Sequence, residues 1–140
     1  MSDILEFRGD YRWLSNMTPC IVTLDGIEYR SVEHAYMSAK SDDAEWKEFC
    51  VNTQSPYTVK QQSKNIILRD DWADNKINVM YSLLVQKFNQ EPFRQKLIDT
   101  GDCYIQEGNR WKDTFWGIDL DTNKGTNHLG NLITKIRDTL

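Results

Sequence analysis

The feature that most limits the fold of this chain is a long apolar stripe with helical spacing between about Asp71 and Asn89. Its members recur every three or four positions: Ala73, Ile77, Met80, Leu84 and Phe88. This spacing predicts one helix of more than four turns, and Pro92 breaks the pattern. A helix of this length must bury its apolar side, so we expect a chain built mainly from packed helices.

Shorter segments complete this prediction. Five further helices are expected. Ser31 is the N-cap of one at 31–40, and Ser55-Pro56 opens another at 57–65. The remaining three are expected around Trp46, Phe49 and Cys50, at 93–101 and at 129–140. Residues 20–24 and 27–30 surround Asp25-Gly26, a strong signal for a β-hairpin, and 4–7 and 104–107 are weaker strand candidates. We predict an α+β, mainly α fold: a single domain over residues 1–140 with a small N-terminal hairpin packed on a helical bundle.

Charge and composition narrow the function. The chain has 17 basic and 21 acidic residues, and its net charge of −4 disfavours a dedicated nucleic-acid binder. Cys20, Cys50 and Cys103 are odd in number and widely spaced, which is typical of reduced thiols. Neither a signal peptide nor a membrane-spanning run is recognisable, so we expect a cytoplasmic protein. His34 and His128 lack partners at ligand spacing, and no metal site or cofactor is predicted.

The first candidate constellation lies in the segment 31–40. Glu33, Tyr36 and Lys40 share one side of the expected helix, opposite Val32 and Ala35. Glu33 and Lys40 would be about 10 Å apart along the helix axis, which fits opposite ends of a bound nucleotide. A purely structural role for Glu33 is also open, because the first turn of a helix favours an acid.

The second constellation lies in the segment 109–117, which has neither helical nor strand periodicity. Asp113 stands there among Trp111, Phe115 and Trp116, followed by Gly117. Tryptophan in a loop can stack on a flat base, but the same rings can fill the core beneath a long connection. The pattern leaves both interpretations open.

Together these motifs resemble the NADAR (YbiA-like) family. The resemblance rests on 7–16, Leu24-Asp-Gly26, Glu33-His-Ala-Tyr36 with Lys40, 68–72 with Lys76, and Asp113-Thr-Phe-Trp-Gly117 with 125–130. It covers essentially the whole chain and implies a mainly helical YbiA-like domain. It also implies N-glycosidase activity, either on ribosylamino-pyrimidine phosphates of the riboflavin pathway or on ADP-ribosyl-guanine in DNA.

The resemblance suggests roles for particular residues. Glu33 is expected to be the catalytic acid nearest the ribose, with Asp113 as a second acid and Lys40 as a phosphate holder or amine nucleophile. Further substrate-binding candidates are Asn16, Tyr36, Lys64, Trp72, Trp116, Gly117 and Arg8.

Two departures from the family pattern bear on the substrate. Ser63-Lys64 stands where relatives have Gly-Arg, so the bidentate grip of arginine on phosphate is missing there, and Ile118-Asp119 replaces an acid and a glycine. We expect the partner to be a small phosphorylated ribosyl compound, with ADP-ribosylated guanine in nucleic acid as a second option and no membrane. The alternatives are a non-catalytic ADP-ribose or nucleotide-binding module and an adaptor for a protein partner.

Overall fold

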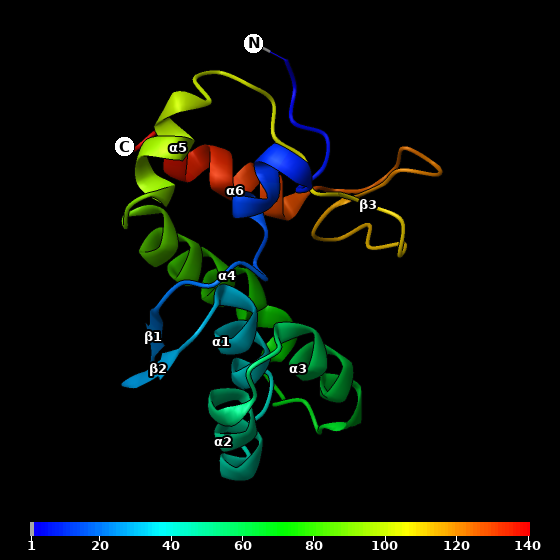
Figure 1. Cartoon of the computed structure of the whole chain (residues 1–140). Coiled ribbons are helices and arrows are strands. Elements are labelled where there is room, and N and C mark those ends of the chain that lie inside the picture. Colours follow the sequence, from blue (N-terminus) through cyan, green and yellow to red (C-terminus); the bar gives the residue numbers. More distant parts are fainter. Residues whose placement is uncertain (1) are drawn as a thin grey trace. The chain divides into compact units, whose positions relative to one another are not determined.

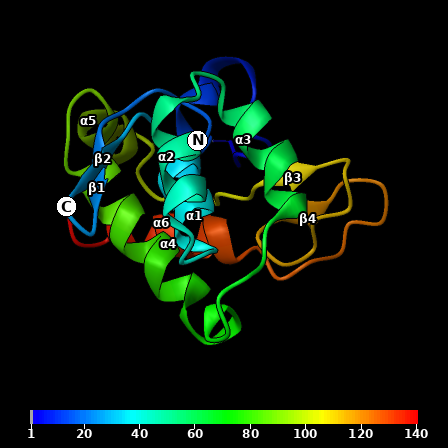
Figure 2. The same cartoon turned by 90° about the horizontal axis from the view of Figure 1, so that it is seen from below.

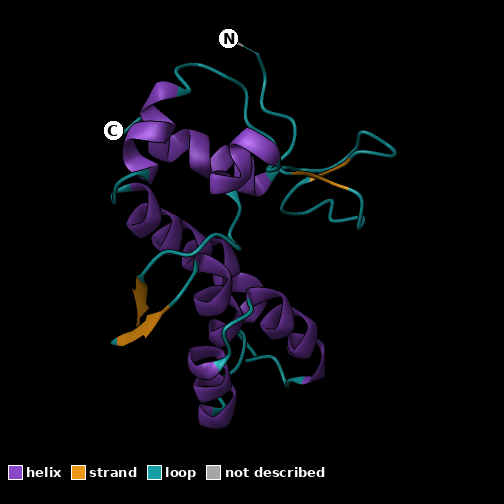
Figure 3. Cartoon of the chain, viewed as in Figure 1, coloured by secondary structure: helices purple, strands orange, loops and turns teal. Residues whose placement is uncertain are grey.

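A computed structural model describes residues 2–140 of the chain. The chain forms two compact units. Residues 16–87 form the central unit, and residues up to 15 together with 88–140 form the terminal unit. Figures 1 and 2 show the elements from two directions, and Figure 3 shows that helices dominate.

The central unit contains the hairpin and most of the helices. Its elements are β1 (Val22–Leu24), β2 (Ile27–Tyr29), α1 (Val32–Ala39), α2 (Ala44–Asn52), α3 (Pro56–Gln62), the 3₁₀ turn η2 (Ser63–Asn65) and α4 (Trp72–Phe88), whose final residue is counted with the terminal unit. The predicted helices at 31–40, around Trp46, at 57–65 and at 71–89 are therefore confirmed, with the third finishing as a 3₁₀ turn.

The hairpin forms where Asp25-Gly26 predicts it. β1 and β2 are antiparallel, with Leu24 opposite Ile27. Asp25 and Gly26 have φ angles of 51° and 80°, the left-handed conformation that a two-residue turn of this type requires. Gln86 of α4 pairs with the outer edge of β1, because its amide accepts from the Thr23 N–H at 2.7 Å and donates to the Thr23 carbonyl at 2.8 Å.

Helix α1 begins as predicted but is more buried than its sequence suggests. The Ser31 hydroxyl accepts a hydrogen bond from the His34 N–H at 3.1 Å and caps the helix. Every residue from Val32 to Ala39 is buried, because α2, α3 and both strands pack around the helix. The side that carries Glu33 and Tyr36 therefore faces protein rather than open solvent.

The terminal unit has fewer regular elements. They are η1 (Gly9–Leu14), a 3₁₀ helix that the sequence did not predict, α5 (Phe93–Asp99), β3 (Gly108–Asn109), β4 (Ile118–Asp119) and α6 (His128–Arg137). β3 and β4 pair in parallel at the two ends of the segment 109–117, which shows no strand periodicity in the sequence. The segments 4–7 and 104–107, which were strand candidates, contain one parallel bridge, between Ile4 and Ile105. The first segment stays short because the chain enters η1 at Gly9.

Two predicted properties can be compared with this structure. All three cysteines are buried free thiols, and burial raises the pKa of Cys50 to about 12. No helix in the described part of the chain is long and apolar enough to cross a bilayer.

Candidate functional site

The N-terminal end of α1 brings two predicted site residues together. The Glu33 N–H donates to the Asn16 carbonyl at 3.1 Å, and the Glu33 side chain is 5 % exposed. The Asn16 side chain points to α4, with its Nδ2 3.5 Å from the Met80 sulfur. Its Oδ1 is buried and has no hydrogen-bond partner among the described residues. A buried acceptor without a protein partner is rare in native structures, and it is available to a ligand or a water molecule.

At the other end of α1, an amine lies against two aromatic rings. Lys40 caps the helix, and its Nζ lies 5.6 Å from the centre of the Tyr36 ring. Tyr36 in turn packs on Trp72, with ring centroids 5.1 Å apart and planes inclined at 55°. Both rings are nearly buried, so in this structure they form a wall of the site rather than an open stacking platform.

The charges around Lys40 come from three helices. Burial lowers the pKa of Lys40, and the positive charges of Lys60 on α3 and Lys76 on α4 lower it further, while the Glu33 carboxylate raises it. The charge of Glu33 thus acts on Lys40, although the axial spacing of about 10 Å predicted from the sequence is too long for a salt bridge. The sequence did not predict that the charges of Lys60 and Lys76 act on Lys40, because helical periodicity says nothing about which other helix lies nearby.

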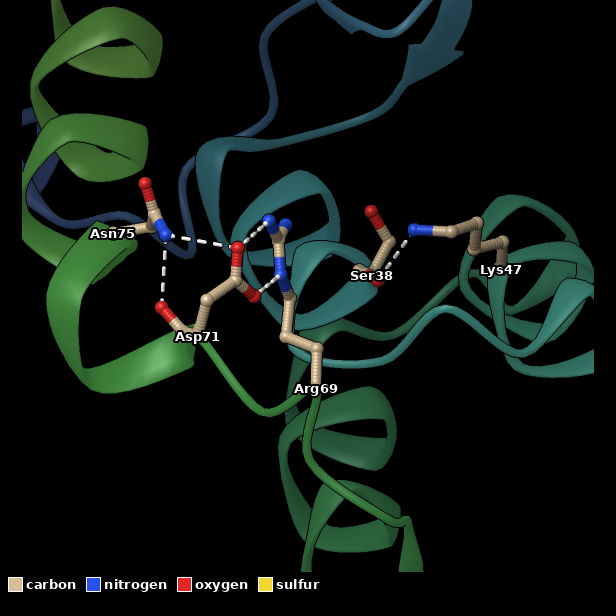
Figure 4. A network of polar contacts seen from close by, with 5 residues as sticks. All are labelled: Ser38, Lys47, Arg69, Asp71 and Asn75. Atoms are coloured by element: carbon tan, nitrogen blue, oxygen red, sulfur yellow. Dashed lines mark hydrogen bonds and ion pairs between the residues drawn. The ribbon is translucent and has the colours of Figure 1, made fainter.

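The loop that leads into α4 is fixed to the end of α1. The Arg69 N–H donates to the Lys40 carbonyl at 2.8 Å. The Arg69 guanidinium makes two bonds to Asp71, at 2.6 and 2.8 Å, and Asn75 donates to the same carboxylate at 3.0 Å (Figure 4). On the other side of α1, Lys47 donates to the Ser38 carbonyl at 3.0 Å (Figure 4). These contacts hold the backbone around Lys40 in place.

The histidine of the Glu-His-Ala-Tyr motif has a structural role. The His34 ring lies 2.7 Å from the Ser31 hydroxyl through Nδ1 and 2.8 Å from the Thr53 carbonyl through Nε2. Because a carbonyl only accepts, Nε2 carries the proton and Nδ1 accepts from Ser31. Burial lowers the pKa of His34, which favours this neutral form. His34 therefore ties the start of α1 to the end of α2.

In the terminal unit, Asp113 organises the loop that carries the second constellation. Its Oδ1 accepts from the Phe115 N–H at 3.0 Å and the Trp116 N–H at 2.9 Å. The Asp113 backbone exchanges two further bonds, both of 3.0 Å, with the Asn109 side chain. A loop-holding role for Asp113 is thus visible, and its predicted role in chemistry stays a prediction.

The residues after Asp113 pack tightly. The half-buried Trp116 ring meets Phe115 edge-on, with centroids 4.9 Å apart, and lies 6.3 Å from His128. Gly117 is buried where a Cβ would collide with both the backbone and the carboxylate of Glu107. Close packing is therefore sufficient reason for glycine at this position. Trp111 is 61 % exposed, so it does not fill a core.

Two predicted substrate-binding residues lie apart from these clusters. Lys64 is exposed in η2 and is not among the charges that shift the pKa of Lys40. Arg8 is exposed before η1 in the terminal unit. The structure therefore brings together Asn16, Glu33, Tyr36, Lys40 and Trp72, and separately Asp113, Trp116 and Gly117.

The NADAR domain family matches residues 6–140. The chain belongs to this family. The NMR structure of the E. coli protein YbiA superposes with a TM-score of 0.85 at 27 % identity, over 99 % of this chain and 86 % of that one. The predicted α+β, mainly α fold of YbiA type is thereby confirmed.

Two relatives of known name are much longer than this chain. A riboflavin biosynthesis protein of Vibrio vulnificus is 31 % identical over 134 residues, which cover 94 % of this chain but 36 % of that protein. The chloroplastic riboflavin biosynthesis protein PYRR of Arabidopsis thaliana is 35 % identical over 81 residues, covering 57 % of this chain and 13 % of that protein. The chain thus spans about a third or less of each relative.

Proposed function

We propose that this NADAR domain is an N-glycosidase that hydrolyses the bond between an anomeric ribose carbon and a nitrogen in a phosphorylated, nucleotide-like substrate. Family membership and the naming of two relatives as riboflavin biosynthesis proteins favour a ribosylamino-pyrimidine phosphate. ADP-ribosyl-guanine is the second substrate class of the proposal.

The observation that carries the proposal is that the buried Glu33 is bonded through its backbone to Asn16, whose buried side-chain oxygen has no partner among the described residues. Cleavage of a ribosyl–nitrogen bond develops positive charge at the anomeric carbon. The Glu33 carboxylate would stabilise that charge or activate the attacking water. The unpaired Asn16 Oδ1 would accept a hydrogen bond from a ribose hydroxyl and so orient the sugar.

Lys40 offers a second route for the same reaction. In the open-chain form of a ribosylamine, the anomeric carbon is an imine carbon that the Lys40 amine can attack. The base would then leave as its free amine, and water would hydrolyse the lysine imine to release the sugar aldehyde. The lowered pKa of Lys40 favours this route, because a larger fraction of the amine is uncharged at neutral pH.

The decisive experiment is mass spectrometry of ribosyl–nitrogen compounds after incubation with the protein. The wild-type protein is expected to release a free base from at least one of them. Glu33→Gln should lower turnover at least ~100-fold, the range for acid–base groups. Glu28→Gln, the same change at an exposed position of β2, should leave turnover unchanged.

Each outcome bears on a specific part of the proposal. Near-wild-type turnover by a folded Glu33→Gln protein would refute the role of Glu33. Binding of ADP-ribose without release of a base from any compound would identify a binding module instead. A borohydride-trapped sugar adduct on Lys40 would select the imine route over direct attack by water.

A further inference from the structure

The turn that leads into α4 is joined to Lys40 in two ways. The Arg69 N–H donates to the Lys40 carbonyl at 2.8 Å, and the turn closes where the Trp72 N–H donates to the Arg69 carbonyl at 3.1 Å. The Trp72 ring packs on Tyr36, and the centre of the Tyr36 ring lies 5.6 Å from the Lys40 Nζ. The turn 69–72 therefore contacts the backbone of Lys40 directly and its amine through two aromatic rings.

Hydrophobic burial holds only one end of this turn. Trp72 at its end is buried, whereas Ile67 and Leu68, directly before its start, are 88 % and 51 % exposed. Segments with few buried apolar contacts open locally at a small cost in free energy. The start of the turn, where Arg69 meets Lys40, therefore depends on polar contacts.

An ion pair within the turn supplies these contacts. The Arg69 guanidinium donates to the Asp71 carboxylate through Nε at 2.6 Å and through Nη2 at 2.8 Å. Asn75, in the first turn of α4, donates to the same carboxylate at 3.0 Å and to the Asp71 carbonyl at 2.8 Å (Figure 4). The two parallel bonds of an arginine–carboxylate pair fix direction as well as distance. The pair thus closes the turn and attaches it to the start of α4.

The effect of this pair on geometry can be separated from its effect on folding. Arg69 is half-buried and Asp71 is exposed, and ion pairs in such positions add little to the free energy of unfolding. By contrast, a misplacement of a reacting group by about 1 Å can lower a rate ~100-fold. A contact that stabilises the fold only weakly can therefore still decide where Lys40 lies.

We propose that the ion pair of Arg69 and Asp71 positions the amine of Lys40. The inference rests on the proposed function, in whose second route this amine attacks the anomeric carbon, and it adds the residues that fix the amine in place. The pair keeps the Arg69 N–H on the Lys40 carbonyl. Through the same turn it keeps the Trp72 ring on Tyr36, over which the amine lies. Arg69 and Asp71 act through Lys40 and are positioning residues.

NMR of the Lys40 side chain tests this role without any substrate. Because its amine lies over the Tyr36 ring, the methylene protons of Lys40 should resonate upfield of those of the exposed Lys124. Arg69→Met should move these signals most of the way to the Lys124 position, while the melting temperature changes little. Asp70→Ala is the matched control and should change neither. Asp70 lies in the same turn, is exposed and makes no side-chain hydrogen bond or ion pair with the described residues.

The two members of the pair should act as one unit. Asp71 also precedes α4, where a negative charge favours the start of a helix, so Asp71→Ala removes more than the pair. In a protein that carries both Arg69→Met and Asp71→Ala, the Lys40 signals should move no further than in Asp71→Ala alone. Signals at the wild-type position in Arg69→Met would overturn the assignment, as would displacements that add in the double variant.

Kinetics separate this assignment from the proposed function. With a compound that the wild type cleaves, Arg69→Met should lower kcat about 10- to 100-fold and change KM less, because it displaces the amine and not the contacts that bind the substrate. An unchanged kcat would overturn the positioning role and leave the glycosidase in place. If no compound is cleaved, the proposed function fails, and the NMR comparison still decides this assignment.

Hydrogen exchange on the unaltered protein covers the case in which a variant does not fold. The Arg69 amide is bonded to the Lys40 carbonyl, whereas the Leu68 amide has no backbone partner among the described residues. After correction for intrinsic rates, the Arg69 amide should therefore exchange more slowly than that of Leu68. Equal rates would show that the turn does not hold Lys40 and would overturn the assignment.

Discussion

Replacing Asp113 separates its visible role in the loop from its predicted role in chemistry. Its Oδ1 accepts two backbone N–H bonds, at 3.0 and 2.9 Å. A hydrogen bond to a charged group contributes about 1.5–3 kcal/mol, and the half-buried position places each bond near the lower end of that range. Asp113→Ala should therefore destabilise the protein by about 2–4 kcal/mol. For a domain of this size, that corresponds to a fall in melting temperature of roughly 6–15 °C.

Asp113→Asn distinguishes the two roles, because the amide oxygen can still accept both bonds while the charge is lost. Its stability should fall by about 1 kcal/mol at most. If the charge also takes part in the chemistry, turnover should fall at least ~100-fold in this well-folded variant. Unchanged turnover would limit Asp113 to the loop.

Urea denaturation followed by circular dichroism gives the free energies of unfolding. Asp121→Ala is the control in the turn that follows β4, since Asp121 is exposed and pairs with the exposed Arg110 at 2.8 Å. A pair of this kind contributes about 0–1 kcal/mol. An Asp113→Ala protein as stable as Asp121→Ala would refute the reasoning from the two backbone bonds.

Three further predictions concern other parts of the chain. Trp116→Ala should weaken ligand binding by about 1–3 kcal/mol if the ring stacks on the base, whereas a large fall in melting temperature with unchanged affinity would identify a packing residue. Burial lowers the pKa of Lys87 to about 7, although Cys20 raises it, and an unfolded lysine titrates near ~10.4. Between these two pKa values the unfolded chain binds more protons than the folded one. The free energy of unfolding of the wild type should therefore rise relative to that of Lys87→Met as the pH rises from about 7 to about 10. A difference in unfolding free energy that does not change with pH would contradict this. Substrate affinity should fall gently with salt, with a log–log slope of about −1 to −2 for one or two phosphates, and a slope steeper than about −4 would indicate a nucleic-acid surface.

The sequence predicts those elements whose determinants are local. The hairpin follows from Asp25-Gly26, whose φ angles the turn needs, and α1 begins at Ser31 because the hydroxyl caps the helix. The 3₁₀ helix η1 was missed because it has no side-chain cap and is too short to show a period. The strand candidates were overestimated because pairing between Ile4 and Ile105 depends on a contact between distant segments.

The site was predicted to the extent that it lies on one helix. The placement of Glu33, Tyr36 and Lys40 on one helix follows from helix geometry alone, and in the structure the charge of Glu33 raises the pKa of Lys40. The complete burial of α1 was not predicted, because its covering comes from α2, α3 and the hairpin. The structural role of His34 was not predicted either, because the Thr53 carbonyl opposite its Nε2 comes from a residue 19 positions away in the chain.

The net charge of the whole chain does not describe the charges around a single site. A net charge of −4 argues against a broad electrostatic grip on a polyanion, and this led to the expectation of a small ligand. In the same chain the negative charge of Glu33 and the positive charges of Lys60 and Lys76 all act on Lys40, whose Nζ lies over the Tyr36 ring. Beyond about 10 Å, salt screens such a cluster, so it acts on a group that reaches it and not along a nucleic-acid backbone. The net charge of the chain therefore limits its electrostatic attraction for a long polyanion, and the charges of a single site have to be read from the structure.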